Sequence, residues 1–310
     1  MTTPLAPGVW GVLATPFRGA DLDVDRESVA ALARHYERIG ATGLTVLGVF
    51  GEAASLAPRE RADVLATVVD ATELPVVAGL TSLATRPALE EAALALEVVG
   101  DRLAGVMLQV SSARPGQVIE HLTAVHDSLG VGVVLQDYPV ASGVSIPGGD
   151  LAAIVEACPF VVAVKSEAPP TSVAIAALTA RLDVPVFGGL GGQGLLDELQ
   201  AGAAGAMTGF SAPEGLLACI TAWNEHGFAA ARAALMPYLP LINLEQQPRI
   251  ALAVRKELLR RRGLIAEAGA RPPAVAFPEA LAPAVEAHLA ELELEVGLAL
   301  GLRAAAGVSR

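Results

Sequence analysis

Short apolar runs alternate along the chain with stretches in which apolar residues recur at the spacing of one helix face. The apolar runs are rich in Val, Leu, Ala and Ile and contain few polar residues, which is typical of parallel strands buried on both faces. The predicted strands are residues 9–14, 44–48, 75–78, 105–110, 131–136, 161–165, 185–187 and 205–208. The helices predicted to follow them are 25–39, 59–70, 87–98, 116–129, 149–157, 171–181, 193–201 and 213–225.

This pattern amounts to eight βα units. It predicts an α/β fold, a (β/α)8 TIM barrel over residues 1–226. A doubly wound open sheet is the alternative, but the count of eight argues against it. Residues 227–296 contain no strand pattern, and we expect them to form a C-terminal helical extension packed on the barrel, with helices at 228–239, 246–262 and 278–295. Residues 297–310 are expected to be a tail that frays.

Composition and charge limit the classes of partner. Apolar residues make up 53% of the 310, enough for a large core, and the net charge of −12 disfavours nucleic acid and anionic membrane surfaces. No run of eighteen uncharged apolar residues occurs, and residues 1–7 do not resemble a secretory signal. Cys158 and Cys219 match no metal or redox spacing. We therefore expect a cytoplasmic protein with neither a membrane nor a nucleic-acid partner.

The chain has only two lysines, Lys165 and Lys256, among 21 basic residues. Lys256 lies in a charged helical stretch and is expected to be solvated. Lys165 ends the sixth predicted strand, where apolar surroundings would disfavour its charged form and lower its pKa. A neutral amine there could attack a carbonyl and form a Schiff base. The alternative is a structural ion pair with Glu52 or Glu167.

Active sites of such barrels form at the carboxyl ends of the strands. Glu167 should project to the same side as Lys165 if the strand stays extended, and it could hold a proton or merely pair with an arginine. The glycines of 48–51 and 188–194 would bring main-chain groups close to an anion, either a phosphate or an organic acid. The five histidines fall in helical stretches and are expected on helix surfaces. The sequence indicates no metal site and no Ser-His-Asp arrangement.

The segment Gly48-Val49-Phe50-Gly51-Glu52-Ala53-Ala54-Ser55-Leu56 together with Lys165 resembles the dihydrodipicolinate synthase / N-acetylneuraminate lyase family. Pro16-Phe17 and Arg271-Pro272-Pro273 are further matches, and the similarity covers roughly residues 8–290. The resemblance implies class I chemistry on pyruvate or another 2-oxo acid, without metal or cofactor. It also implies a homotetramer built as a dimer of dimers.

Four positions depart from the pattern of this family. Val49 and Phe50 stand where it usually has two hydroxyl residues, Ser112 where a synthase has a Tyr, and Gln136 where it has the main catalytic Tyr. The arginine expected near Ala141 is missing as well. True dihydrodipicolinate synthase activity is therefore not expected. Instead, Gln136-Asp137 before Tyr138-Pro139, with Lys165-x-Glu167 and the glycines around Gly189, resembles the branch that includes 2-keto-3-deoxy sugar acid dehydratases.

These observations predict a Schiff-base lyase, a dehydratase or aldolase, acting on a 2-oxo acid. Lys165 would form the Schiff base, and Glu167 or Tyr138 would move the proton. Main-chain N–H groups near Phe50 and Gly51 would hold the carboxylate. The residues expected to contact substrate are Gly48, Val49, Phe50, Gly51, Ser112, Gln136 and Gly189. A catalytically impaired relative that binds a 2-oxo acid as a sensor or scaffold is the alternative.

Overall fold

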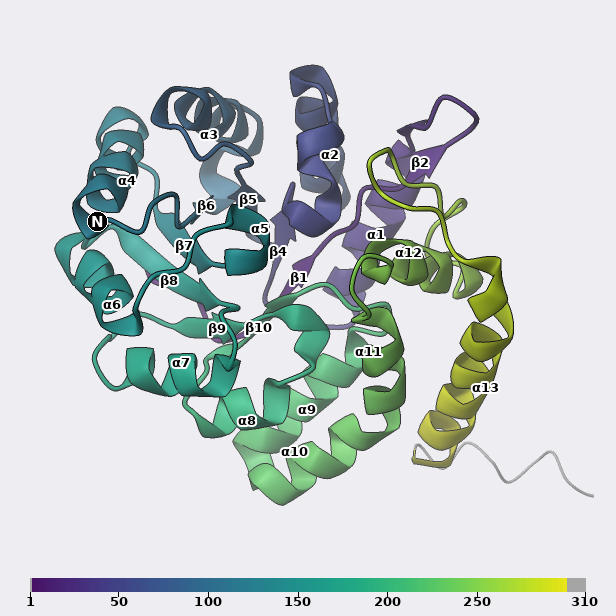
Figure 1. The fold of residues 1–310 in the computed structure, drawn as a ribbon. Helices are drawn as coiled ribbons and strands as arrows, with labels where there is room; N and C mark the ends of the chain where they lie inside the picture. Colours follow the sequence, from purple (N-terminus) through teal and green to yellow (C-terminus); the bar gives the residue numbers. More distant parts are fainter. Residues whose placement is uncertain (1, 300–310) are drawn as a thin grey trace, which may run out of the picture.

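Eight parallel strands close into a barrel in the computed structural model, which describes residues 2–299 (Figure 1). The first strand closes the barrel by pairing with both the second and the last strand of the ring. The predicted (β/α)8 TIM barrel is therefore confirmed. The strands are β1 (Gly8–Val12), β4 (Gly43–Val46), β5 (Val76–Gly79), β6 (Leu103–Gln109), β7 (Val133–Asp137), β8 (Val161–Ser166), β9 (Val186–Gly188) and β10 (Gly205–Thr208).

Helices surround the barrel, and local sequence signals set several of their ends. Asp25 caps the first helix by accepting a hydrogen bond from the N–H of Ser28, and Pro58 occupies the first turn of the second. Gly130 ends the fourth in the left-handed region. The helices between strands are α1 (Arg26–Arg38), α2 (Pro58–Ala71), α3 (Thr85–Val99), α4 (Pro115–Leu129), α6 (Gly148–Ala157), α7 (Thr171–Thr179), α8 (Leu195–Gln200) and α9 (Glu214–His226).

The inside of the barrel is packed rather than hollow. Trp10, Met107, Phe187 and Met207 point into one buried cluster with apolar side chains from the other strands. Because side chains fill the barrel interior, we expect the active site above this layer, at the carboxyl ends of the strands.

Several short elements at this mouth were not predicted. The antiparallel pair β2 (Phe17–Arg18) and β3 (Asp23–Val24) precedes α1, and α5 (Pro139–Ser142) follows β7. Two-residue strands and single turns are too short to produce a hydrophobic period. The remaining short turns at the mouth are the 3₁₀ helices η1 (Val49–Gly51), η2 (Ala53–Ser55) and η4 (Leu190–Gly192), whereas η3 (Gly100–Arg102) precedes β6 at the opposite end of the barrel.

The described part of residues 227–299 contains helices and loops but no strand, as predicted. It comprises α10 (Phe228–Leu235), η5 (Met236–Tyr238), α11 (Leu239–Glu245), α12 (Ala251–Arg261), η6 (Glu279–Leu281) and α13 (Ala282–Ala299). Leu241, Val254 and Leu258 share a buried cluster with Val9 and Phe210 of the barrel.

Several boundaries in this region differ from the prediction. The helical stretch expected to end at residue 239 continues through α11 to Glu245, and the α-helix expected from residue 278 begins at Ala282 after η6. The helix expected from residue 246 begins at Ala251, because residues 246–250 form a turn. The helix α13 continues to Ala299, so residues 297–299 of the expected tail are helical, and residues 300–310 lie outside the described residues. Among the residues described, no helix is both long enough and apolar enough to cross a membrane.

Candidate active site

Lys165 and Glu167 lie side by side at the end of β8. Lys165 is 7% exposed, and its Nζ lies 3.2 Å from Oε2 of Glu167. The amide Nε2 of Gln136, on the neighbouring strand β7, donates to the same Oε2 at 2.7 Å. The main-chain N–H of Leu190 donates to Oε1 of Glu167 at 3.3 Å. Of the two carboxylates considered as ion-pair partners of Lys165, the structure selects Glu167.

A cavity of about 120 Å³ opens over this pair. Seven of the predicted site residues line it, which are Gly48, Val49, Phe50, Gln136, Tyr138, Lys165 and Glu167. The cavity also has walls that the sequence did not indicate, formed by side chains such as Thr45, Met107, Thr208, Gln246 and Arg255. A water needs roughly 10–15 Å³ on this measure, so the cavity has room for a small organic acid.

Three predicted contact residues do not line the cavity. The N–H of Gly51 donates to the carbonyl of Gly48 at 2.9 Å inside η1, so it is not free to hold a carboxylate. The hydroxyl of Ser112 donates to Oε1 of Gln117 at 2.7 Å at the start of α4. Gly189 lies behind Glu167, where an added Cβ would come 2.1 Å from Oε1 of that carboxylate. Gly189 therefore makes room for Glu167 rather than approaching a ligand.

The prediction that Lys256 is solvated is wrong. Its side chain is 0% exposed, and it pairs with Glu52 and donates to the carbonyl of Gly269 at 2.7 Å. The charged run around it looked like a surface face because its partner lies far away in the sequence. The ion pair leaves Glu52 unavailable to Lys165.

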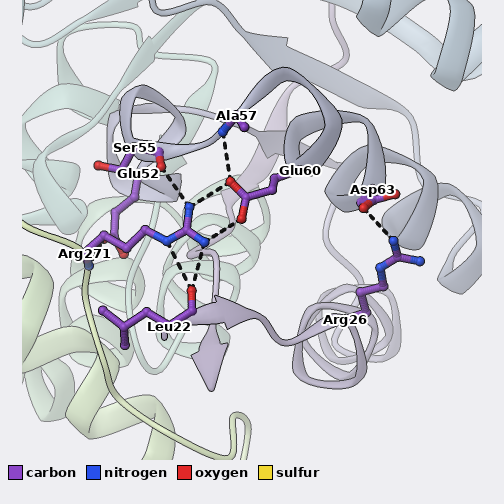
Figure 2. A network of polar contacts seen from close by, with 8 residues as sticks. All are labelled: Leu22, Arg26, Glu52, Ser55, Ala57, Glu60, Asp63 and Arg271. Atoms are coloured by element: carbon purple, nitrogen blue, oxygen red, sulfur yellow. Dashed lines mark hydrogen bonds and ion pairs between the residues drawn. The ribbon is translucent and has the colours of Figure 1, made fainter. Parts of the chain in front are cut away.

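Arg271 completes the polar network around Glu52 (Figure 2). Its main-chain N–H donates to Oε2 of Glu52 at 2.9 Å, and its guanidinium binds Glu60 and the carbonyl oxygens of Leu22 and Ser55. Through these contacts Arg271 anchors the loop after α12 to the segments that surround the barrel mouth.

Two histidines are buried, contrary to the expectation of helix surfaces. His35 and His121 are each less than a tenth exposed, and the Nδ1 of His121 lies 2.9 Å from the Thr85 hydroxyl. Burial lowers the pKa of both, so they are neutral at pH 7. Within residues 2–299 no group of three His, Cys, Asp or Glu side chains could hold a metal ion.

Burial also shifts the carboxyl groups around Glu167. It raises the pKa of Asp137 to about 6, with a further contribution from the charge of Glu167. It raises the pKa of Glu198 to about 7, although a hydrogen bond from Thr171 opposes the shift. Burial and Glu167 raise the pKa of Tyr138 too. Tyr138 is therefore a neutral phenol at pH 7, able to donate a proton but not to accept one in the resting site.

Arg255 is the functional candidate that the sequence reasoning missed. It lies on α12 next to Lys256, and its guanidinium carbon is 3.7 Å from the centre of the Phe50 ring. Its Nε donates to Oε2 of buried Glu245 at 2.8 Å. The only sequence signal was the same charged run that was interpreted as a solvated face.

Comparison with known proteins agrees with this architecture. L-2-keto-3-deoxyarabonate dehydratase of Azospirillum brasilense is 27% identical over 283 residues, which is 88% of this chain and 90% of the relative. The 4-hydroxy-tetrahydrodipicolinate synthase of Kineococcus radiotolerans is 29% identical over 302 residues, covering 96% of this chain and 94% of the relative.

Solved structures agree as well. Dihydrodipicolinate synthase of Rhodopseudomonas palustris superposes with a TM-score of 0.86 at 28% identity, covering 93% of this chain and 98% of that one. A pyruvate complex of an E. coli K12 prophage protein superposes with a TM-score of 0.83 at 22% identity, covering 93% and 99%, and shows the shared fold. The model of the dihydrodipicolinate synthetase family matches residues 6–292, nearly the whole chain. The chain is a lyase that belongs to the dihydrodipicolinate synthetase family.

Proposed function

We propose that the chain is a dehydratase of a 2-keto-3-deoxy sugar acid that works through a Schiff base on Lys165. The observation that carries the proposal is the contact of 3.2 Å between the amine of Lys165 and the carboxylate of Glu167, both of which line the cavity at the barrel mouth. The dehydratase relative that aligns over 88% of this chain supports the choice of substrate class.

The residues can perform each proton transfer that this chemistry needs. Glu167 accepts a proton from the Lys165 ammonium, and the neutral amine then attacks C2 of the 2-oxo acid. The proton left on nitrogen passes to the new alkoxide, which gives a carbinolamine. The carbinolamine loses water when Glu167 gives the proton it accepted to the departing hydroxyl, which leaves a protonated iminium. Glu167, a carboxylate again, next removes a proton from C3 to give an enamine. Glu167 then gives that proton to the C4 hydroxyl, which leaves as water, and hydrolysis of the iminium frees the product and Lys165.

Aldol cleavage of a C3–C4 bond would proceed through the same enamine, so the alternative lyase reaction shares every residue up to that point. The role of Gln136 is one of orientation. Its amide has no useful acid or base form, but it fixes Glu167 through the 2.7 Å hydrogen bond. A non-catalytic sensor would not need a proton acceptor beside its lysine. The position of Glu167 beside the amine supports the catalytic hypothesis.

Borohydride trapping tests the proposal. Wild-type protein incubated with pyruvate or a 2-keto-3-deoxy sugar acid and then reduced should gain one ligand mass on the peptide that contains Lys165. Lys165→Arg keeps the charge but should form no adduct, because a guanidinium is a very weak nucleophile at neutral pH. An adduct that persists in Lys165→Arg, or one that maps to Lys256, would contradict the proposal.

A further inference from the structure

The cavity over Lys165 contains a second cation that takes no part in the proposed reaction. Lys165 and Arg255 both line it, but Lys165 is paired with Glu167 and becomes part of the covalent intermediate. The carboxylate of a bound 2-oxo acid still needs a partner of opposite charge or several hydrogen-bond donors. Among the described residues that line the cavity, Arg255 is the one cation left for that task.

The surroundings of Arg255 hold its guanidinium in one orientation. Its Nε donates to Glu245 at 2.8 Å, and Glu245 is 0% exposed and is itself fixed by the main-chain N–H of Ser211 at 3.1 Å. The face of the guanidinium stacks on the Phe50 ring at 3.7 Å. A planar cation held by one carboxylate and one ring keeps its other N–H groups aimed in a fixed direction.

The two Nη groups of Arg255 remain free to bind a ligand. Within the described residues neither of them has a hydrogen-bond partner, since the hydrogen bond of this side chain to Glu245 uses Nε. Nη1 lies against Gly209, where an added Cβ would come within 2.9 Å of it. Gly209 and Arg255 line the same cavity. Because Gly209 has no side chain, the space beside Nη1 stays open to that cavity.

Neutral donors such as the Thr45 hydroxyl and the Gln246 amide also line the cavity, but the η1 wall contributes no side-chain donor. The side chains of Val49 and Phe50 cannot donate hydrogen bonds, and the N–H of Gly51 is bonded to Gly48 at 2.9 Å. The N–H of Glu52 is likewise bonded, to the carbonyl of Val49 at 3.1 Å. Phe50 nevertheless contributes, because its ring is the platform on which the guanidinium rests.

We propose that Arg255 binds the carboxylate of the 2-oxo acid and makes the site selective for anionic carbonyl compounds. This inference rests on the proposed function, since it assigns the group that holds the substrate of the same lysine. The Phe50–Arg255 stack would replace the pair of hydroxyl residues that stand at positions 49 and 50 in the pattern of the family.

The test compares borohydride trapping of pyruvate with that of pyruvamide, which has nearly the same shape but no charge. Wild-type protein should reach half-maximal trapping at a much lower concentration of pyruvate than of pyruvamide. In Arg255→Met combined with Glu245→Gln, which leaves no unpaired buried charge, the value for pyruvate should rise about 10–100-fold. The value for pyruvamide should change less than about threefold, and Arg255→Lys should be intermediate for pyruvate.

Arg26→Met removes an exposed ion pair with Asp63 and serves as the matched control, with trapping of both compounds unchanged. Equal loss of both compounds in each folded Arg255 variant would show a structural role and overturn the inference. Retained preference for pyruvate in those variants would overturn it as well. If wild-type protein traps neither compound, the Schiff-base proposal itself fails, and the two failures are thereby distinguished.

Discussion

Three donors converge on the carboxylate of Glu167. They are the ammonium of Lys165, the amide of Gln136 and the main-chain N–H of Leu190. A carboxylate fixed by several donors stays in one orientation while it exchanges protons with its neighbours. At the residue scale, the proposed acid–base group therefore directly follows β8, two positions after the lysine, and the β7 position contributes only an oriented amide.

Glu167→Gln should lower turnover about 10²–10⁴-fold, because an amide can neither accept nor return the proton. Adduct formation between Lys165 and pyruvate should persist in this variant at high pyruvate, since the nucleophile is retained. Steady-state turnover of the deoxy sugar acid and intact mass after borohydride measure the two effects separately. Tyr138→Phe is the matched control in the same cavity, and a full loss of turnover there with little loss in Glu167→Gln would assign the proton transfer to the phenol.

Glu198 should make stability depend on pH near neutrality. Its pKa is raised from 4.5 to about 7, so the folded protein holds this proton more tightly than the unfolded chain does. Its contribution is therefore most favourable below about pH 4.5 and is lost as the pH rises to about 7. Glu198→Gln cannot ionise, so relative to wild type it should gain up to about 3 kcal/mol of unfolding free energy between pH 5 and pH 8.

Urea unfolding at pH 5 and pH 8 measures this difference. The matched control is Glu90→Gln, which changes an exposed carboxylate and should shift stability equally at both pH values. A Glu198→Gln variant whose difference from wild type is the same at pH 5 and pH 8 would show that the carboxyl is ionised throughout.

At the scale of elements, the helix α12 connects the barrel mouth with the C-terminal extension. Arg255 reaches the cavity, and the next residue, Lys256, reaches Glu52 after β4. Side chains at neighbouring positions on a helix point about 100° apart. One turn of α12 therefore contributes both to the cavity and to the ion pair with Glu52. The glutamate of the Gly48–Glu52 segment thus has a structural role, since it anchors α12 and receives the N–H of Arg271.

Lys256→Met should destabilise the protein by about 3–5 kcal/mol, because it leaves the carboxylate of Glu52 buried without its partner. Adding Glu52→Gln removes that charge and should recover part of the loss. Urea unfolding at pH 7 provides the measurement. Arg260→Met, which removes a partly exposed ion pair with Glu257 on the same helix, should cost less than about 1 kcal/mol. Equal effects of Lys256→Met and Arg260→Met would contradict a buried, energetically important pair.

The limits of sequence reasoning are also clearest in this helix. The period of apolar residues shows that 251–261 is helical, but it cannot show that Lys256 meets a carboxylate 204 positions earlier. For the same reason the sequence did not indicate Arg255, because the orientation of its guanidinium depends on contacts with Phe50 and Glu245. In contrast, Lys165 and Glu167 could be predicted because Glu167 directly follows the strand that contains Lys165, and alternation along extended chain sets their side. Residues on one element are predictable, whereas partners on different elements need the fold.

At the scale of the whole molecule, the count of eight βα units in the sequence predicted the barrel. Strands such as β7 are buried on both faces, so their apolar runs are visible without knowledge of the fold. Their ends at the mouth were less well predicted. Leu13, Ala14 and Leu47 are buried beyond the ends of their strands, which made the predicted strands too long. The sequence pattern and the structure therefore differ most at the barrel mouth. The cavity lies at this same end.

The barrel and the C-terminal helices should unfold as one cooperative unit, although the sequence pattern changes near residue 227. Leu241, Val254 and Leu258 are buried in one cluster with Val9 and Phe210, and the Lys256–Glu52 pair crosses the same boundary. Removal of residues 227–310 would expose that apolar surface, leave Glu52 unpaired and remove a wall of the cavity. We therefore expect a single calorimetric transition whose van't Hoff and calorimetric enthalpies agree, and no pyruvate trapping by residues 1–226. Two separate transitions, or a folded 1–226 fragment that traps pyruvate, would show instead that the extension is an independent domain.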